Sequence, residues 1–167
     1  DGRYQTEDDI YHIAYKTAWL DLFSVNCSIK VSTVAQRCPL RSLEFITLKI
    51  KDAVCDVFNA AKGSRPSVDK SAPDMRIHAF LTESRCTIYL DTSGEALFKR
   101  GWRVQTGEAP LRENLAAGIL RLAGWQPDQA LLDPMCGSGT FLIEAAHMAL
   151  NIAPGARRPL ALEQIIP

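Results

Sequence analysis

Residues 131–140 read LLDPMCGSGT, and residues 141–146 continue as FLIEAA. An apolar run, a turn with two glycines and a second apolar run predict a strand, a turn and a helix. In open α/β sheets ligands bind beyond the carboxyl ends of the strands, and Asp133 stands at such an end. The glycines allow a sharp turn and a close approach of a ligand to the main chain. We expect Thr140 to cap the helix, whose first N–H groups favour an anionic group.

Two phosphate-binding turns do not fit this stretch. A P-loop needs a lysine directly after its last glycine, but Thr140 follows Gly139. A dinucleotide-binding turn needs a third glycine at the position that Leu142 occupies. A turn that merely connects a strand to a helix stays open as an alternative.

A resemblance decides between these interpretations. The string DPMCGSGT at 133–140 resembles the first motif of class I S-adenosylmethionine-dependent methyltransferases that act on exocyclic amino groups of nucleobases. Residues 93–103 and 109–117 look like the segments that join the two domains of bacterial large-subunit ribosomal RNA guanine-N2 methyltransferases. Residues 48–54 and 65–69 look like the THUMP domain of the same family, which binds RNA.

The resemblance implies S-adenosylmethionine as the cofactor and no metal. In that family the glycine turn cradles the methionine part of the cofactor, the acid at the strand end accepts from its ammonium group, and the helix after the linker helps to wall the pocket. The residues that it assigns to the cofactor are Asp133, Pro134, Cys136, Gly137, Ser138, Gly139, Thr140, Pro110, Glu113 and Asn114. We expect Cys136 to be a packing residue or a backbone contact, not a nucleophile.

Basic residues gather locally although the net charge is zero. Residues 37–70 hold seven bases against four acids, and residues 99–121 hold five against two. Such patches are typical of RNA-binding surfaces, although a set of solvated faces fits the charges too. We expect contacts to RNA from Lys49, Arg65, Lys99, Arg100 and Arg103. Lys51 lies two residues from Lys49 on a predicted helix, so only one of the two can face the RNA.

Periodicity outlines the secondary structure. The clearest helix is predicted to run from the N-cap Ser42 to Gly63, just past its end. Alternation predicts a strand at 25–31 and a hairpin of strands at 75–81 and 86–91. In the second half we expect helices at 111–122 and 140–151 and a short strand at 130–133.

The expected fold class is an α+β THUMP-like RNA-binding domain followed by the truncated start of an α/β Rossmann-like class I methyltransferase domain. We place the first at residues 1–104, incomplete at its N-terminus and including a linker, and the second at residues 105–167. The acid that binds the cofactor ribose and the Asn-Pro-Pro-Tyr-type motif that binds the target base are absent from these residues. We therefore assign no catalytic residue and expect the chain to be a fragment.

The implied reaction is methyl transfer to the exocyclic N2 of a guanine in 23S ribosomal RNA. Adenine-N6 methylation of a nucleic acid and an RNA-binding module without catalysis remain alternatives. No apolar run approaches the ~20 residues of a membrane helix. The five cysteines show no metal-ligand spacing and fit the reduced thiols of a cytoplasmic protein.

Overall fold

The computed structural model describes residues 1–102 and 110–165. They form two compact units, Asp1–Gly94 with residues 160–165 and Glu95–Pro159. The domain boundary expected between residues 104 and 105 lies outside the described residues and stays a prediction.

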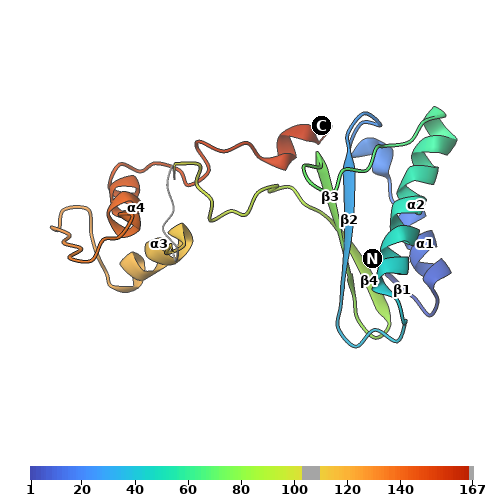
Figure 1. Ribbon diagram of the computed structural model, residues 1–167, viewed down its shortest axis with the longest axis horizontal. Coiled ribbons are helices and arrows are strands. Elements are labelled where there is room, and N and C mark those ends of the chain that lie inside the picture. Colours follow the sequence, from blue (N-terminus) through green and yellow to red (C-terminus); the bar gives the residue numbers. More distant parts are fainter. Residues whose placement is uncertain (103–109, 166–167) are drawn as a thin grey trace. The chain divides into compact units, whose positions relative to one another are not determined.

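The first unit is a four-stranded sheet with two helices on one face (Figure 1). Its elements are β1 (Gly2–Arg3), α1 (Glu7–Tyr15), the 3-10 helix η1 (Trp19–Asp21), β2 (Ile29–Ala35), α2 (Leu43–Lys62), β3 (Met75–Leu81), β4 (Arg85–Leu90) and the 3-10 helix η2 (Ala161–Gln164). The strand order is β1-β4-β3-β2. The strands β2 and β3 are parallel, so the chain between them must cross over the sheet, and α2 makes that crossing. The other two pairs are antiparallel.

The helix α2 begins and ends as predicted. The Ser42 side chain accepts a hydrogen bond from the N–H of Phe45 at 3.2 Å. At the other end Gly63 adopts a φ of 68° and donates its N–H to the carbonyl of Asn59 at 2.9 Å. A residue with a Cβ would be strained in this left-handed conformation, so glycine ends the helix here.

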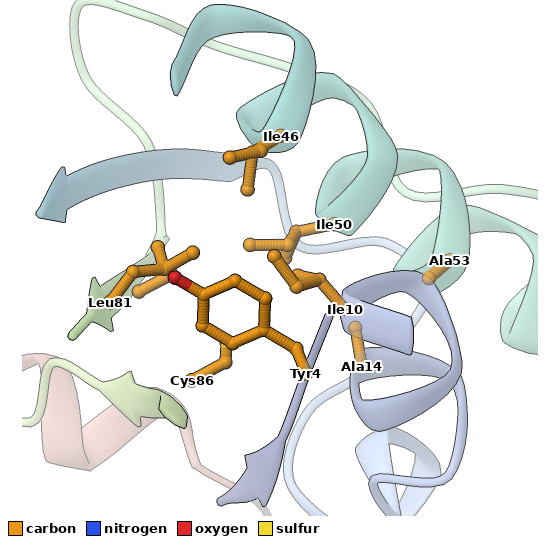
Figure 2. Packing of buried hydrophobic residues seen from close by; sticks show 9 residues of the cluster. Tyr4, Ile10, Ala14, Ile46, Ile50, Ala53, Leu81 and Cys86 are labelled. Carbon is orange, nitrogen blue, oxygen red and sulfur yellow. The ribbon is translucent and has the colours of Figure 1, made fainter. Parts of the chain in front are cut away.

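The core lies between the sheet and the two helices. Figure 2 shows the ring of Tyr4 among the side chains of Ile50, Leu81 and Cys86, all of them buried. A second cluster gathers around Phe58, whose ring centroid lies 5.1 Å from that of Phe23. Both clusters pack against one face of β3. This is the face on which the alternating apolar residues of β3 lie, as the sequence predicts.

One predicted strand is shifted along the sequence. The strand expected at 25–31 forms as β2, but it starts at Ile29 and continues to Ala35, opposite Met75 to Leu81. Just before it, the Ser28 N–H and hydroxyl donate to the Asp74 carboxylate at 2.7 and 2.8 Å. This side-chain bonding competes with ladder pairing and delays the start of the strand.

The second unit holds α3 (Glu113–Leu122) and α4 (Thr140–Ala149), which pack against each other. The strand predicted at 130–133 is wrong, because these residues form no ladder. A strand needs a partner for its backbone groups, and the described part of the second unit contains no other strand. Leu132, which the prediction placed in a sheet, is 85% exposed.

Candidate cofactor site

The glycine turn leads directly into α4. Gly137 and Gly139 have φ values of 52° and 73°, in the left-handed region. The Gly139 N–H donates to the carbonyl of Cys136 at 2.7 Å, and its own carbonyl accepts from the N–H of Ile143 at 2.9 Å. Gly139 is therefore the N-cap, and the expectation that Thr140 caps the helix is wrong. The sharp turn requires a left-handed φ at the cap, and glycine adopts this conformation without strain. Thr140 is the first helical residue.

A cavity of about 450 Å³ opens beside the turn. It is lined by Pro110, Leu111, Asp133, Met135, Cys136, Gly137, Ser138, Thr140 and Phe141. Six of the ten residues predicted for the cofactor therefore meet in one cavity, and Pro110 joins them from a segment more than 20 residues earlier. A volume of this order is typical of sites for small molecules.

The turn offers room and polar groups to a ligand. A Cβ built on Gly137 would meet no other atom within 4 Å, so the main chain is open to close approach there. Asp133 is half-buried, and its Oδ1 accepts from the Met135 N–H at 3.2 Å, which holds the carboxylate at the edge of the cavity. A fixed carboxylate beside an open main-chain turn fits the amino-acid end of S-adenosylmethionine, whose ammonium needs an acceptor.

Four predicted cofactor residues do not line this cavity. Pro134 and Gly139 belong to the turn itself, while Glu113 and Asn114 of α3 border two neighbouring hollows. The lining residues that the sequence reasoning missed are Leu111, Met135 and Phe141. They are apolar residues within or next to residues 109–117 and 133–140, and no sequence pattern distinguishes an apolar wall of a cavity from ordinary core packing.

The cations predicted to bind RNA have diverse surroundings. On α2, the Lys49 Nζ lies 2.7 Å from Asp8 Oδ1, whereas Lys51 pairs with Asp52 at 2.5 Å. Arg65 is exposed in the loop after α2. Lys99 is exposed and pairs with Glu95 at 2.6 Å. Arg103 lies outside the described residues, so the RNA contacts of this set stay a prediction.

Arg100 has the most buried position of these cations. Its Nε and Nη2 donate to the two carboxylate oxygens of Glu144 at 3.2 and 3.0 Å. The two side chains are only 10% and 4% exposed. Such a two-pronged pair is oriented and strong, so a phosphate contact by Arg100 would require the pair to break. The one signal for it in the sequence was an acid inside the apolar run FLIEAA of α4.

The described residues offer neither a candidate metal site nor a candidate membrane-spanning helix. No three His, Cys, Asp or Glu side chains in residues 1–102 and 110–165 come together to hold a metal ion. None of the helices in the same ranges combines the length and the apolar character that crossing a membrane requires.

A family model of the THUMP domain matches residues 4–91, more than half of the chain. The chain belongs to the THUMP-domain family. The matched residues are those of the first unit apart from its ends, so β2, β3 and β4 with α1 and α2 form the THUMP domain, and β1 lies just before the match. A second family model, described as an RMKL-like methyltransferase domain, matches residues 100–165, which include the glycine turn after the THUMP domain.

Two curated relatives, both ribosomal RNA methyltransferases by name, match nearly the whole chain. The chain is 45% identical over 161 residues to "Ribosomal RNA large subunit methyltransferase K/L" of Saccharophagus degradans, and this match covers 94% of the chain and 21% of that protein. The protein of the same name in Pseudoalteromonas atlantica is 46% identical over 160 residues, with 95% and 23% covered. The chain thus spans about a fifth of the length of these relatives.

Solved structures of methylases and methyltransferases resemble the chain over nearly its whole length. The chain resembles a predicted N6-adenine-specific DNA methylase from Listeria monocytogenes, with a TM-score of 0.85 and 28% identity over 98% of this chain and 43% of that one. It also resembles SMU.472, a putative methyltransferase complexed with SAH, with a TM-score of 0.82 and 32% identity over 98% and 44%. The expected fold class is confirmed: a THUMP domain is followed by the start of a Rossmann-like methyltransferase domain.

Proposed function

We propose that this sequence is part of an S-adenosylmethionine-dependent methyltransferase that modifies the exocyclic N2 of a guanine in 23S ribosomal RNA in the cytoplasm. The observation that carries the proposal is the cavity at the glycine turn, where Asp133, Gly137 and Pro110 meet. The names of the curated relatives support ribosomal RNA as the substrate. The THUMP domain supports RNA as the polymer that the first unit binds.

In this proposal the residues of the chain bind the cofactor and do not catalyse the methyl transfer. We propose that Asp133 accepts from the cofactor ammonium, while Gly137 lets the main chain approach the methionine part. The N-terminus of α4 carries the positive end of the helix dipole, which suits the carboxylate at the same end of the cofactor. The bound cofactor supplies an electrophilic methyl group. We assign no catalytic residue to this chain.

We propose that three cations, Lys49, Arg65 and Lys99, contact RNA, because none of them would have to leave a buried ion pair. Arg65 and Lys99 are exposed, and Lys49 holds its Asp8 partner at the surface. Exposed ion pairs such as Lys49–Asp8 and Lys99–Glu95 contribute little to stability, so a phosphate can replace the carboxylate at a small cost in free energy. Arg103 is the fourth cation of the proposal, and Arg100, the fifth that the sequence predicts, is left out because it pairs with Glu144.

The test uses the complete enzyme that we propose, with labelled S-adenosylmethionine and unmodified 23S ribosomal RNA. We expect the label in N2-methylguanosine after digestion of the RNA to nucleosides. Gly139→Val should abolish cofactor binding in calorimetry, because a β-branched residue does not adopt a φ of 73°. Cys136→Ala in the same turn is the matched control and should bind the cofactor almost normally. Equal affinity of Gly139→Val and the parent would show that the turn is only a connector.

The same experiment separates the alternatives. The name of the Listeria monocytogenes relative favours adenine N6 of DNA as a second candidate, which label in N6-methyladenine would support. An RNA-binding module without catalysis predicts RNA binding and no label in any nucleoside. The 167-residue chain on its own should transfer no methyl group, because it lacks the Asn-Pro-Pro-Tyr-type motif.

A further inference from the structure

The sheet of the THUMP domain has a second face that α1 and α2 do not cover (Figure 1). On β3, Met75, Ile77, Ala79 and Leu81 point into the core and are at most 2% exposed. Because side chains alternate along a strand, the residues between them lie on the opposite face. We call this surface the open sheet face; its central residues are Ser32, Val34, His78, Phe80, Thr87 and Tyr89.

Aromatic rings occupy the middle of the open sheet face. His78 and Tyr89 are direct partners in the register of β3 and β4, and Phe80 follows two residues after His78. Tyr89 is 53% exposed, and the side chain of His78 is 50% exposed. The Ser32 hydroxyl lies 2.6 Å from His78 Nδ1, which fixes the imidazole ring on the sheet. Neighbouring exposed rings on a rigid sheet are suited to stacking against flat, unpaired bases.

Two cations stand beside these rings. Lys30 and Arg76 are opposite each other in the register of β2 and β3. They lie two residues before the pair of Ser32 and His78, on the same face of the sheet. The Lys30 Nζ donates to the Lys70 carbonyl at 2.8 Å, and Arg76 donates to the Gly94 carbonyl at 3.3 Å. Within the described ranges neither cation forms an ion pair with a carboxylate. Their positive charge is therefore available to a phosphate.

The acids near the face are held by other groups. Asp91 lies 3.9 Å from His78 Nε2, and its Oδ1 accepts from the N–H groups of Ser93 and Gly94. Asp69 lies near Lys30, but its Oδ1 accepts from the N–H groups of two residues in its own loop. The face thus combines exposed rings with cations. This combination complements the bases and phosphates of a nucleic acid better than it complements an apolar surface of another protein.

We propose that the open sheet face binds single-stranded RNA, with bases stacked on Tyr89 and His78 and phosphates beside Lys30 and Arg76. The inference rests on the proposed RNA-binding function and locates it on the sheet face opposite α2, the helix that carries the predicted cation Lys49. Base-paired RNA hides its base faces, so the surface distinguishes an unpaired segment from a duplex.

The test measures the affinity of the 167-residue chain for a fluorescent 12-nucleotide oligouridine and for an RNA duplex of matched length. Tyr89→Ala should weaken binding to the oligouridine about 5- to 150-fold, the usual range for one stacked base, and leave duplex binding unchanged. Tyr89→Phe keeps the ring and should bind within about twofold of the parent. Tyr15→Ala is the matched control, because Tyr15 of α1 is also an exposed tyrosine, at 41%.

Other outcomes overturn the proposal in distinguishable ways. If Tyr89→Ala binds normally while Lys49→Ala and Arg65→Ala weaken binding, RNA binding stands and the open sheet face is not its site. If the parent binds neither RNA, the proposed RNA-binding function fails as well. If Tyr89→Ala converts a dimer into a monomer in sedimentation without changing RNA affinity, the face is a protein contact. As a second measurement, oligoribonucleotides with 5-iodouridine should crosslink to Tyr89 or His78 under ultraviolet light, as peptide mapping would reveal.

Discussion

The first unit holds Trp19, Phe23 and Phe58 at 1% exposure, whereas the second leaves Leu122 and Leu132 at 90% and 85%. The THUMP domain closes a core of its own between its sheet and its helices. In the second unit Ala116, Leu120 and Ala145 are the buried apolar residues of α3 and α4. A helical layer with apolar residues in water gains stability when another layer covers it. The THUMP domain therefore has a closed core, whereas several large apolar side chains of the second unit are exposed.

The largest expected effect tests the closed core of the THUMP domain. Phe58→Ala should lower its free energy of unfolding by about 3–5 kcal/mol, because a buried ring leaves a cavity. Phe45→Ala on the same helix is the control, since Phe45 is 48% exposed, and should cost no more than about 0.5 kcal/mol. Urea unfolding followed by circular dichroism measures both. If Leu132→Ala in the second unit proved as costly as Phe58→Ala, the contrast between the two units would be wrong.

A smaller effect concerns the buried pair of Arg100 and Glu144. Arg100→Met leaves the Glu144 carboxylate buried without its partner and should destabilise α4 by about 1–3 kcal/mol. Hydrogen exchange of the α4 amides should accelerate accordingly, while exchange in α2 stays unchanged. The double variant Arg100→Met with Glu144→Leu should restore slow exchange, because an apolar pair needs no charge compensation. Equal exchange in the parent and the single variant would mean that the pair adds nothing to the second unit.

The smallest effect is a dependence on pH that belongs to the THUMP domain. Hydrogen bonds from the Ser28 N–H and hydroxyl hold the pKa of Asp74 below its usual 3.8. Since the folded pKa is lowered, the stabilisation is complete above pH 3.8 and is lost as the pH falls through the folded pKa. Thermal unfolding between pH 6 and pH 2.5 should show this loss in the parent, and Asp74→Asn should flatten it. The same slope in both proteins would contradict the role of Asp74.

Local sequence signals were sufficient to predict the elements that depend on contacts between neighbouring residues. Ser42 and Gly63 set the ends of α2, and the alternation at 75–81 identified β3, because caps and periodicity depend on neighbouring residues. The members of the cavity at the glycine turn were largely predicted too, through a motif that occupies consecutive positions.

Distant contacts were less predictable. The start of β2 depends on Asp74, which lies 46 residues from Ser28. The buried pair joins Arg100 to Glu144 across 44 residues, and no spacing rule links the two positions. The open sheet face likewise needs the register of β3 and β4 before His78 and Tyr89 become neighbours. Such features follow from the topology and not from local pattern.

The order of strands has a consequence for synthesis on the ribosome. The Tyr4 hydroxyl donates to the Thr82 carbonyl at 2.5 Å, across 78 residues, and β1 pairs with β4 at the far end of the THUMP domain. Residues 2–4 therefore leave the exit tunnel more than 80 residues before the strand with which β1 pairs. Helices α1 and α2 can form early, but the sheet beneath them closes only when Leu90 has emerged. The four-stranded sheet can therefore be complete only after β4 has been synthesised.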